Sequence, residues 1–429
     1  MRKETTEPVP SYYEASKNQV IDAPVLSGDL KTDVVVIGGG LTGCSTALHL
    51  AEAGAEVVQL EAAHYGWGAS GRSGGQIING YSVEQDDLEK MVGEITAREL
   101  WDHSVEAVEY TLGLIERHKI DCDWQPGYLH VGVKPRHASE LEEWAEHLSK
   151  HYDYDILQYL DQKQLREILS SELYSGGVAD PGSGHLHPLN YCLGVAKAAQ
   201  NAGANMYQHT RVQKVIQSAN GYRVETESGS IECQQVVYAC NAYLDRLAPA
   251  IGNKIMPVGT YIVATEPLGE TVARNLISNQ SAVADTNFVL DYYRTSADHR
   301  LLFGGRVSYS TLEPRKLTQS LQTRMLRVFP QLAGVKIEFS WGGYVAITRN
   351  RAPHIGRQKD GTWFAQGFSG HGMALTGYVG RLLSKAVTGD DSHLKCFYQI
   401  PHASFPGGRL LRTPALVAAM SYYRMRDHL

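Results

Sequence analysis

Hydrophobic and polar positions near the start of the chain change from a strand pattern to a helix pattern and back. Residues 33–37, DVVVI, form a continuous apolar run, which is typical of a strand buried on both faces. From residue 41 to residue 51 apolar positions recur at helical spacing, and Gly54 is typical of a helix end. A second apolar run, EVVQL, is followed by Glu61. The pattern predicts a strand–helix–strand unit of about 30 residues.

Farther along, the pattern keeps alternating between helices and strands. Helical spacing covers residues 86–118 and 137–151, and a third predicted helix ends near Gly203. Residues 210–243 predict a meander of short strands, because apolar residues alternate there between glycine turns. Residues 254–345 are rich in Tyr, Phe and Val with period-2 stretches, which predict a larger sheet.

The remaining segments are shorter. Residues 363–389 predict a strand, a glycine turn and an amphipathic helix. Residues 1–29 are mixed and contain prolines, so we expect a surface arm. The tail from residue 401 predicts a short terminal helix.

Glycines in the first unit have the spacing of a nucleotide-binding turn. Gly38 permits a tight turn, Gly40 lets a pyrophosphate approach the backbone, and Gly43 lets the helix pack closely on the strand. The helix then begins at Leu41 and Thr42, whose N–H groups and dipole favour phosphate. Glu61 follows the second strand, where an acid accepts hydrogen bonds from a ribose. Since strand, helix and acid are all present, we predict dinucleotide binding.

A second glycine-rich segment follows at residues 66–77, GWGASGRSGGQI. Five of its twelve residues are glycine, a composition that disfavours helix and strand interiors. Such a segment is typical of backbone that a ligand approaches closely. A tight glycine loop with a solvent-facing Arg72 is the alternative.

Composition excludes several classes of function. The 429 residues have a net charge of −6, which argues against nucleic acid as a partner. No apolar run reaches the roughly 18 residues of a membrane span, and the start does not have the pattern of a signal peptide. Six scattered cysteines without CxxC spacing indicate a reducing cytoplasm. The sequence does not indicate the oligomeric state.

The fingerprint ending at Glu61, the segment GASGRSGGQ, the stretch GGY…RAPHIG and the segment QGFSGHGMALTGYVGRLL together resemble the D-amino-acid-oxidase superfamily of FAD enzymes. Within it, SYYEAS, IDCDWQPGYL, SGHLHPLN, LDYYRTSADHRLLFGG, FPQLAGVKI and SFPGGRLLR resemble the γ-glutamylputrescine oxidases over nearly the whole chain. The resemblance implies an α/β fold in which a Rossmann-like FAD-binding domain is interleaved with a mixed-sheet substrate domain. It assigns residues 30–100, 185–250 and 346–400 to the first domain and residues 101–184 and 251–345 to the second.

The resemblance implies that the flavin ring and its linker lie against Gly68–Gln76. Arg72 then meets the flavin or its phosphates, and Ser73 and Gln76 bond to polar ring edges. Some relatives carry a histidine linked to flavin in this loop, whereas this chain has Arg72, so non-covalent FAD is expected. The other FAD-binding residues expected from this loop are Ala69, Ser70, Gly74 and Gly75.

The C-terminal GFSGHGM is expected to form the other half of the flavin site. N–H groups around residues 370–373 favour the negative charge that reduction places on the N1/O2 edge. His371 is a candidate catalytic residue; a histidine bonded to a neighbouring backbone group is the alternative. Val212 is expected to contact adenine through its backbone, or to be a plain strand end. The expected flavin contacts in this segment are Gly367, Ser369, Gly370, Gly372 and Met373.

One departure from the resemblance bears on the substrate. Amino-acid oxidases of this superfamily carry an arginine that binds the substrate carboxylate, at a position that here is close to Val345, with Tyr344 before it. Without the bidentate arginine that a carboxylate favours, the reacting carbon is expected to carry none. Tyr344 and Val345 are therefore candidates for the catalytic and substrate sites.

Tyr292, Tyr293 and Arg294 lie in the stretch that resembles the substrate sheet. We expect an aromatic side chain from this set to cover the aliphatic stem of the substrate, and an arginine farther out to hold a glutamyl carboxylate. Ordinary core tyrosines of a strand are the alternative.

The expected reaction is oxidation of the terminal amine of γ-glutamylputrescine or a related γ-glutamyl-polyamine. Hydride passes to the flavin, the imine is hydrolysed to aldehyde and ammonia, and O2 yields H2O2. Two alternatives stay open: an oxidase or dehydrogenase of another amine or N-methyl amino acid, and a non-catalytic FAD-binding or sensing protein.

No metal site is expected. His147 and His151 have helical i,i+4 spacing, but the sequence shows no HExxH motif or carboxylate partner for them. His185 and His187 flank a leucine at the start of a helix, where polar capping explains them.

Overall fold

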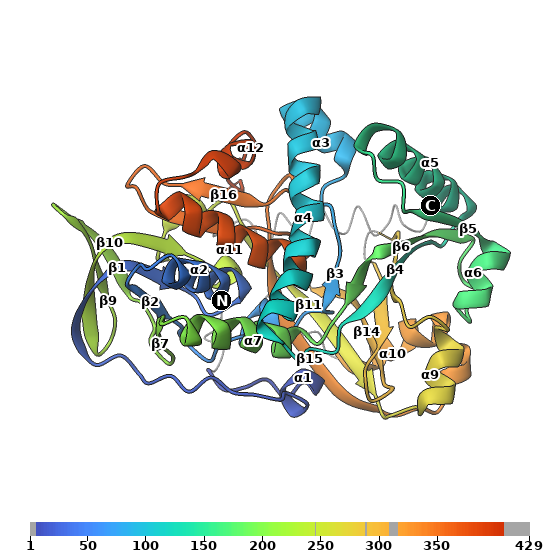
Figure 1. Cartoon of the computed structure of the whole chain (residues 1–429). Helices are drawn as coiled ribbons and strands as arrows, with labels where there is room; N and C mark the ends of the chain where they lie inside the picture. Colours follow the sequence, from blue (N-terminus) through green and yellow to red (C-terminus); the bar gives the residue numbers. More distant parts are fainter. Residues whose placement is uncertain (1–5, 245, 288–289, 309–315, 407–429) are drawn as a thin grey trace.

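The computed structural model describes residues 6–406 except residues 245, 288–289 and 309–315. The described strands form two sheets, one of eight strands and one of nine. Figure 1 shows the two sheets in separate halves of the view, with α4 (Glu94–His118) between them. The chain crosses between the halves several times, so both sheets are built from distant parts of the sequence.

The eight-stranded sheet contains the predicted strand–helix–strand unit. Its main path runs β16–β17–β10–β1–β2–β7, with β9 beside β10 and β8 beside β9. The strands are β1 (Gly28–Ile37), β2 (Val57–Leu60), β7 (Asn205–Tyr207), β8 (Lys214–Ser218), β9 (Gly221–Glu225), β10 (Gly229–Tyr238), β16 (His354–Arg357) and β17 (Trp363–Gln366). Because β1 is parallel to both β2 and β10, the end of β1 lies where the strand order reverses, the usual ligand position in such sheets.

Strand β1 shows why its apolar run is continuous. Val34 and Val36 belong to the core shared with α2 (Leu41–Glu52), α7 (Pro188–Asn201) and α11 (Met373–Val387). Val35 and Ile37 belong to a second core, on the side of the β8–β9–β10 meander. Both faces are buried, as the DVVVI pattern predicts.

The nine-stranded sheet follows the order β15–β11–β14–β13–β12–β4–β6–β3, with β5 beside β6. Its strands are β3 (Gln76–Ile77), β4 (Gln125–Gly132), β5 (Gln158–Asp161), β6 (Gly176–His185), β11 (Met256–Thr265), β12 (Ala282–Asp285), β13 (Tyr292–Thr295), β14 (Leu301–Ser308) and β15 (Ile337–Ile347). Side chains on one face pack with α6 (Gln162–Ile168), α9 (Glu270–Leu276) and α10 (Leu317–Val328). The opposite face lines a cavity described below.

The remaining helices include several that the sequence predicts. The helical pattern of 86–118 forms two helices because Gly93, at φ +82°, ends the first and precedes the second. The other helices are α1 (Tyr12–Ala15), α3 (Gln85–Val92), α5 (Pro135–Tyr152), α8 (Pro249–Gly252) and α12 (Lys395–Tyr398). The predicted terminal helix cannot be compared beyond residue 406, since residues 407–429 lie outside the described part.

The predicted domain boundaries run close to the division between the two sheets. One departure is β3, which lies in the 30–100 range and yet pairs with β6 of the nine-stranded sheet. Another is α4, which packs against α11 of the first half although most of its residues fall in the 101–184 range. The full assignment of segments to domains stays a prediction.

The expected surface arm is partly wrong. Tyr13 is fully buried, with ring centroids 4.9 Å from His187 and 5.2 Å from Trp341. The Tyr12 hydroxyl donates to Asp298 at 2.8 Å. Tyrosines near Pro10 therefore fasten this segment to both halves of the molecule, because aromatic side chains bury large areas wherever they find a complementary surface.

Candidate functional site

The turn after β1 has the geometry that a pyrophosphate requires. Gly38 has φ +121°, which a residue with a side chain rarely adopts. A Cβ atom at Gly43 would lie 2.0 Å from the Gly38 carbonyl oxygen, so only glycine lets α2 approach β1 this closely. Gly40 is the N-cap of α2 and supplies no side-chain hydrogen bond to the first turn. The Leu41 N–H donates to the Ser70 hydroxyl at 3.0 Å, so the loop at residues 69–71 lies directly over the helix start.

Glu61 lies beside this turn. Its two carboxylate oxygens accept from the N–H groups of Gly39 and Ala63, each at 2.7 Å. Burial raises the pKa of the Glu61 carboxyl, while these N–H donors oppose the rise. Because a carboxylate oxygen can accept more than one hydrogen bond, the acid retains capacity for ribose hydroxyls.

Val212 lies near the same edge of the sheet. Two residues before it, the Thr210 N–H donates to the Glu61 carbonyl at 2.8 Å. The backbone that leads to Val212 therefore runs beside Glu61, consistent with the adenine end of a dinucleotide.

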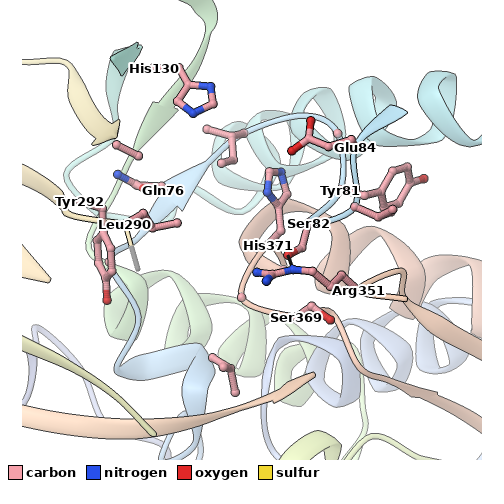
Figure 2. A pocket seen from close by; sticks show the side chains of 18 of the residues that line it. Gln76, Tyr81, Ser82, Glu84, His130, Leu290, Tyr292, Arg351, Ser369 and His371 are labelled. Atoms are coloured by element: carbon pink, nitrogen blue, oxygen red, sulfur yellow. Dashed lines mark hydrogen bonds between the residues drawn. The ribbon is translucent and has the colours of Figure 1, made fainter. Parts of the chain in front are cut away.

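The second glycine segment borders a large cavity of about 1100 Å³. Volumes of about 300–1,000 Å³ suffice for most small-molecule ligands, so this cavity has room for a ring system and a substrate. Figure 2 shows side chains from both halves of the chain around it. Of the residues predicted to bind FAD, the cavity is lined by Ala69, Arg72, Ser73, Gly74, Gly75, Gln76, Ser369, Gly370, Gly372 and Met373.

Arg72 is buried at the base of the cavity. Its guanidinium lies 4.1 Å from the Trp67 ring centroid, and its Nη1 donates to the Gly342 carbonyl at 3.4 Å. The Arg72 carbonyl accepts from the Trp341 indole at 3.0 Å. The alternative of a solvent-facing arginine is therefore wrong, and a fixed cation lies beside the predicted flavin position.

The segment between β17 and α11 borders the cavity from the other side. Gly372 is the N-cap of α11 and provides no side-chain hydrogen bond, so the positive end of this 15-residue helix faces the cavity. Ser369 precedes it at φ +55°, and its N–H donates to the Ala346 carbonyl at 3.0 Å. Gly367 does not line the cavity; its N–H donates to Asn241 Oδ1 at 2.9 Å and fixes the turn.

Ser73 connects these two segments. Its hydroxyl lies 3.0 Å from the Met373 sulfur. Gln76 also lines the cavity, and its Nε2 donates to the Val283 carbonyl at 3.2 Å. The two halves of the predicted flavin site are therefore in contact.

His371 lines the cavity and has a backbone partner. Its Nε2 lies 2.6 Å from the Asn79 carbonyl, which only accepts, so Nε2 carries the proton. Burial lowers the pKa of His371. Burial, followed by electrostatic coupling to the His371 ring, lowers the pKa of His130 to about 4. Figure 2 shows both rings at the cavity. The backbone-bonded alternative describes this histidine, and a neutral imidazole is its resting form.

We therefore expect His371→Gln to remain active, because the glutamine amide can also donate to the Asn79 carbonyl. The rate of flavin reduction at saturating substrate should stay within about tenfold of the unmodified enzyme, measured by stopped-flow absorbance. A general acid–base role would instead lower the rate by about 10²–10⁴-fold and remove a limb of the pH profile.

The candidate catalytic role of Tyr344 is not supported by its position. Side chains alternate along β15, so Gly343, Val345 and Ile347 line the cavity while Tyr344 packs on the other face. The Tyr344 ring centroid lies 6.2 Å from that of Tyr243. Val345 is a wall of the cavity, as expected for a substrate contact.

The residues predicted to contact substrate on β13 also lie on different faces of the sheet. Tyr292 lines the cavity, and Figure 2 shows its ring beside Gln76. Tyr293 faces the core on the other side, with its ring stacked 5.5 Å from Phe303. A core tyrosine, the alternative reading, is correct for Tyr293.

The predicted substrate role of Arg294 is also corrected by its position. The side chain is 4% exposed, and it does not line the cavity. Its Nε donates to the Gly74 carbonyl and its Nη2 to the Leu186 carbonyl, both at 2.8 Å. The same Nη2 also lies 3.2 Å from the Tyr13 hydroxyl. These bonds fix the backbone of the glycine segment rather than a ligand.

Several cavity residues escaped the sequence reasoning. They include Asn79, Tyr81, Ser82, Glu84, Tyr128, His130, Asp180, Asp285, Arg349 and Arg351. They come from loops and strands that only the folded chain brings together, and no local motif marks them. The stretch TRNRAP was the one available signal, since two arginines follow the strand that carries Val345.

His147 has carboxylate neighbours that the sequence did not reveal. Its Nε2 lies 3.6 Å from Asp86 and 3.4 Å from Glu89, and its ring stacks on His151. The expectation that no carboxylate accompanies this pair is wrong, because α3 packs beside α5. His187 is the N-cap of α7, where its Nδ1 accepts from the Asn190 N–H at 3.1 Å, as the capping explanation predicts.

Comparison with known proteins decides the family. The profile of the FAD dependent oxidoreductase family matches residues 33–386. The chain belongs to this family. It is therefore an FAD-dependent oxidoreductase with the predicted D-amino-acid-oxidase fold, and FAD is its cofactor.

Two bacterial oxidoreductases are similar to this chain over nearly its whole length. The chain is 41% identical to the gamma-glutamylputrescine oxidoreductase of Escherichia coli (strain K12) over 99% of both chains. It is 42% identical to a probable oxidoreductase, OrdL, of Haemophilus influenzae over 98% of both. The crystal structure of glycine oxidase from Geobacillus kaustophilus superimposes with a TM-score of 0.73, 22% identity, and coverage of 86% of this chain and 98% of that one. The narrower resemblance seen in the sequence is confirmed.

The structure itself fits the cofactor. The start of α2 turns the positive end of the helix toward the predicted pyrophosphate position, and the cradle at Gly38 and Gly43 leaves no room for side chains. The start of α11 provides a second positive helix end at the cavity. Among the described residues, no helix is long and apolar enough to cross a membrane.

Proposed function

We propose that this enzyme oxidises the terminal amine of γ-glutamylputrescine, or of a related γ-glutamyl-polyamine, to an aldehyde with release of ammonia and H2O2. The observation that carries the proposal is the uncharged wall beside the predicted flavin position. Along β15 and β11 the cavity is lined by Gly343, Val345, Ile347, Val258 and Thr260. An aliphatic amine fits such a wall, because β11 and β15 carry no cationic side chain that could bind a carboxylate on the reacting carbon. The nearby Arg72 is assigned to the flavin and not to the substrate.

FAD, when bound, supplies the two-electron acceptor, and O2 takes the electrons from the reduced cofactor. The N–H groups at the start of α11 would stabilise the negative charge that a bound flavin gains on reduction. Arg72 adds a positive charge on the side of the glycine segment. We propose that FAD is held non-covalently, because Arg72 takes the place of the histidine that links flavin in some relatives.

The protein also positions the amine. Tyr292 and Gln76 lie on the nine-stranded sheet at the cavity, and the Tyr292 ring is held between Gly74 and Gly304. Asp180 on β6 and Asp285 on β12 are buried carboxyl groups that line another part of the cavity, and they favour the approach of a cationic amine. Burial, followed by the charge of Asp291, raises the pKa of Asp285 to about 7. Asp285 is therefore partly protonated near neutral pH.

The test is an anaerobic titration of the purified enzyme that follows the loss of oxidised-flavin absorbance. We expect γ-glutamylputrescine to bleach the flavin rapidly, and free putrescine, sarcosine and D-alanine to bleach it slowly or not at all. Admission of air should then restore the absorbance and produce H2O2 in equal amount. Precipitation with acid should release all of the yellow colour into the supernatant.

Other results would overturn parts of the proposal. Bleaching by sarcosine or D-alanine alone would replace the proposed substrate with an N-methyl or D-amino acid. Bleaching by γ-glutamylputrescine without peroxide in air would make the enzyme a dehydrogenase with another electron acceptor. A flavin that none of the amines reduces would favour the non-catalytic alternative.

A further inference from the structure

The outer part of the cavity is built from two segments that touch each other. Arg351 Nε donates to the Ser82 hydroxyl at 3.1 Å, and Asn350 Nδ2 lies 3.7 Å from the Met91 sulfur of α3. These contacts join the turn at residues 349–351 to residues 81–91, which comprise a short loop and most of α3, and we call this pair of segments the outer rim. The outer rim includes Glu84 and Arg349, two exposed residues that line the cavity.

The outer rim presents charges of both signs to the cavity. Figure 2 shows Arg351, Ser82 and Glu84 around the same space, with the guanidinium of Arg351 directed toward it. Burial, followed by the charge of Asp87, raises the pKa of the Glu84 carboxyl, while the positive charge of Arg351 lowers it. Glu84 is the N-cap of α3, but its side chain caps no N–H of that helix.

The backbone at Arg351 is held in an unusual conformation. Its φ is +62°, a region that long side chains rarely occupy. The turn is fastened on both sides, because Thr348 Oγ1 donates to the Ala352 carbonyl and Asn350 Nδ2 to the Pro401 carbonyl, each at 2.7 Å. Such conformations persist where the surroundings determine them, and they concentrate at ligand sites. The strained turn directs Arg351 to the cavity instead of to solvent.

We propose that Arg351 and Glu84 form a subsite for the α-amino-acid head of the substrate, in which the guanidinium binds the head carboxylate and the Glu84 carboxylate binds the head ammonium. This subsite deepens the proposed function and rests on it, since a γ-glutamyl group carries both charges on one carbon. The reacting nitrogen lies nine bonds from that carbon, a span of about 10 Å when extended. The head therefore occupies the outer rim while the amine reaches the uncharged wall at Val345.

Arginine suits this position because its planar fork binds a carboxylate with two parallel hydrogen bonds. A hydrogen bond to a charged group contributes about 1.5–3 kcal/mol, which corresponds to roughly 10–150-fold in affinity. The interaction is made far from the reacting carbon, so its loss should raise KM and leave the rate at saturation nearly unchanged.

The experiment measures three variants with three acylated putrescines that differ only in the head. γ-Glutamylputrescine carries carboxylate and ammonium, N-glutarylputrescine carries the carboxylate alone, and N-butanoylputrescine carries neither. Arg351→Gln should raise KM for the first two by about 10–100-fold and leave the third unchanged. Glu84→Gln should raise KM only for γ-glutamylputrescine, by about fivefold. Arg351→Lys should recover part of the loss.

Two control variants make the result specific. Arg357→Gln removes an exposed arginine that stacks on Trp363, away from the cavity, and should change none of the constants. Arg349→Gln removes the neighbouring exposed arginine of the outer rim. A loss on Arg349→Gln in place of Arg351→Gln would overturn the assignment, as would equal losses for all three compounds in Arg351→Gln.

A binding measurement separates this inference from the proposed function. γ-Glutamylethylamide carries the same head but has no terminal amine, so it tests the head subsite without turnover. We expect it to perturb the oxidised-flavin spectrum of the unmodified enzyme saturably, and Arg351→Gln to weaken this binding by at least about tenfold. Failure of the compound to bind would overturn the head subsite. Binding without reduction by any putrescine derivative would retain the subsite and overturn the proposed reaction.

Discussion

Gly43→Ala is expected to yield a protein that does not retain FAD through gel filtration. The new Cβ would lie 2.0 Å from the Gly38 carbonyl oxygen and 3.0 Å from Gln59 Nε2. The closer of these atoms belongs to the backbone, so no side-chain rotation relieves the clash. Helix α2 must then move away from β1, and the N–H groups at Leu41 move with it. We expect FAD affinity to fall at least about 100-fold and stability to fall by about 1–3 kcal/mol.

The measurement is the ratio of flavin absorbance to protein absorbance after gel filtration, together with the thermal unfolding midpoint. Gly113→Ala is the matched control, because a Cβ there meets no heavy atom within 4 Å. Gly113 lies inside α4, where alanine should stabilise the helix by about 1 kcal/mol, and the variant should keep its full flavin content. If Gly43→Ala kept all of its FAD, the close approach of α2 and β1 would have no part in binding the cofactor.

The nucleotide-binding half could be predicted from the sequence because its determinants are local. Gly38, Gly43 and Glu61 act within one strand–helix–strand unit, and each residue type has one geometric reason to be there. The buried run at residues 33–37 also determined its strand, since both of its faces meet apolar cores. Residue spacing and the apolar pattern therefore predicted the same strand–helix–strand unit.

The substrate side could be predicted only in part, because strand alternation depends on which face a sheet turns to the cavity. A stretch such as YY in β13 has one side chain for each face, and the sequence alone does not say which tyrosine faces the ligand. Tyr292 faces the cavity and Tyr293 the core; Val345 faces the cavity and Tyr344 does not. The outer rim depends on contacts between residues about 270 positions apart, such as Arg351 and Ser82. No spacing rule links such positions.

Arg294 shows that the sequence does not distinguish an arginine that binds backbone carbonyls from one that binds a ligand. An arginine after two tyrosines on a substrate strand suggested a carboxylate partner. In the structure its donors reach backbone carbonyls of Gly74, Leu186 and Thr295 instead. The first of these belongs to the glycine segment predicted to hold the flavin. Arg294 therefore connects the nine-stranded sheet to the second glycine segment.

Arg294→Met should consequently lower both stability and flavin content, because methionine fills part of the space and leaves the carbonyls of Gly74 and Leu186 without their donor. Each buried carbonyl without a partner costs about 1–3 kcal/mol, so we expect a loss of about 3 kcal/mol in the free energy of unfolding. Thermal unfolding, followed by flavin fluorescence, should show this as a lower midpoint. The molecules that still hold FAD should have an unchanged KM for γ-glutamylputrescine.

Arg357→Met is the control variant. Arg357 is exposed and stacks on the Trp363 ring, so removing its guanidinium should change the unfolding midpoint little. The opposite outcome for Arg294→Met is equally clear: full flavin content, an unchanged midpoint and a raised KM. That result would return Arg294 to the substrate site and would mean that its bonds to Gly74 and Leu186 are replaced when substrate binds. If Arg294→Met loses both flavin and stability, then Arg294, which lies outside the cavity, controls the shape of the second glycine segment.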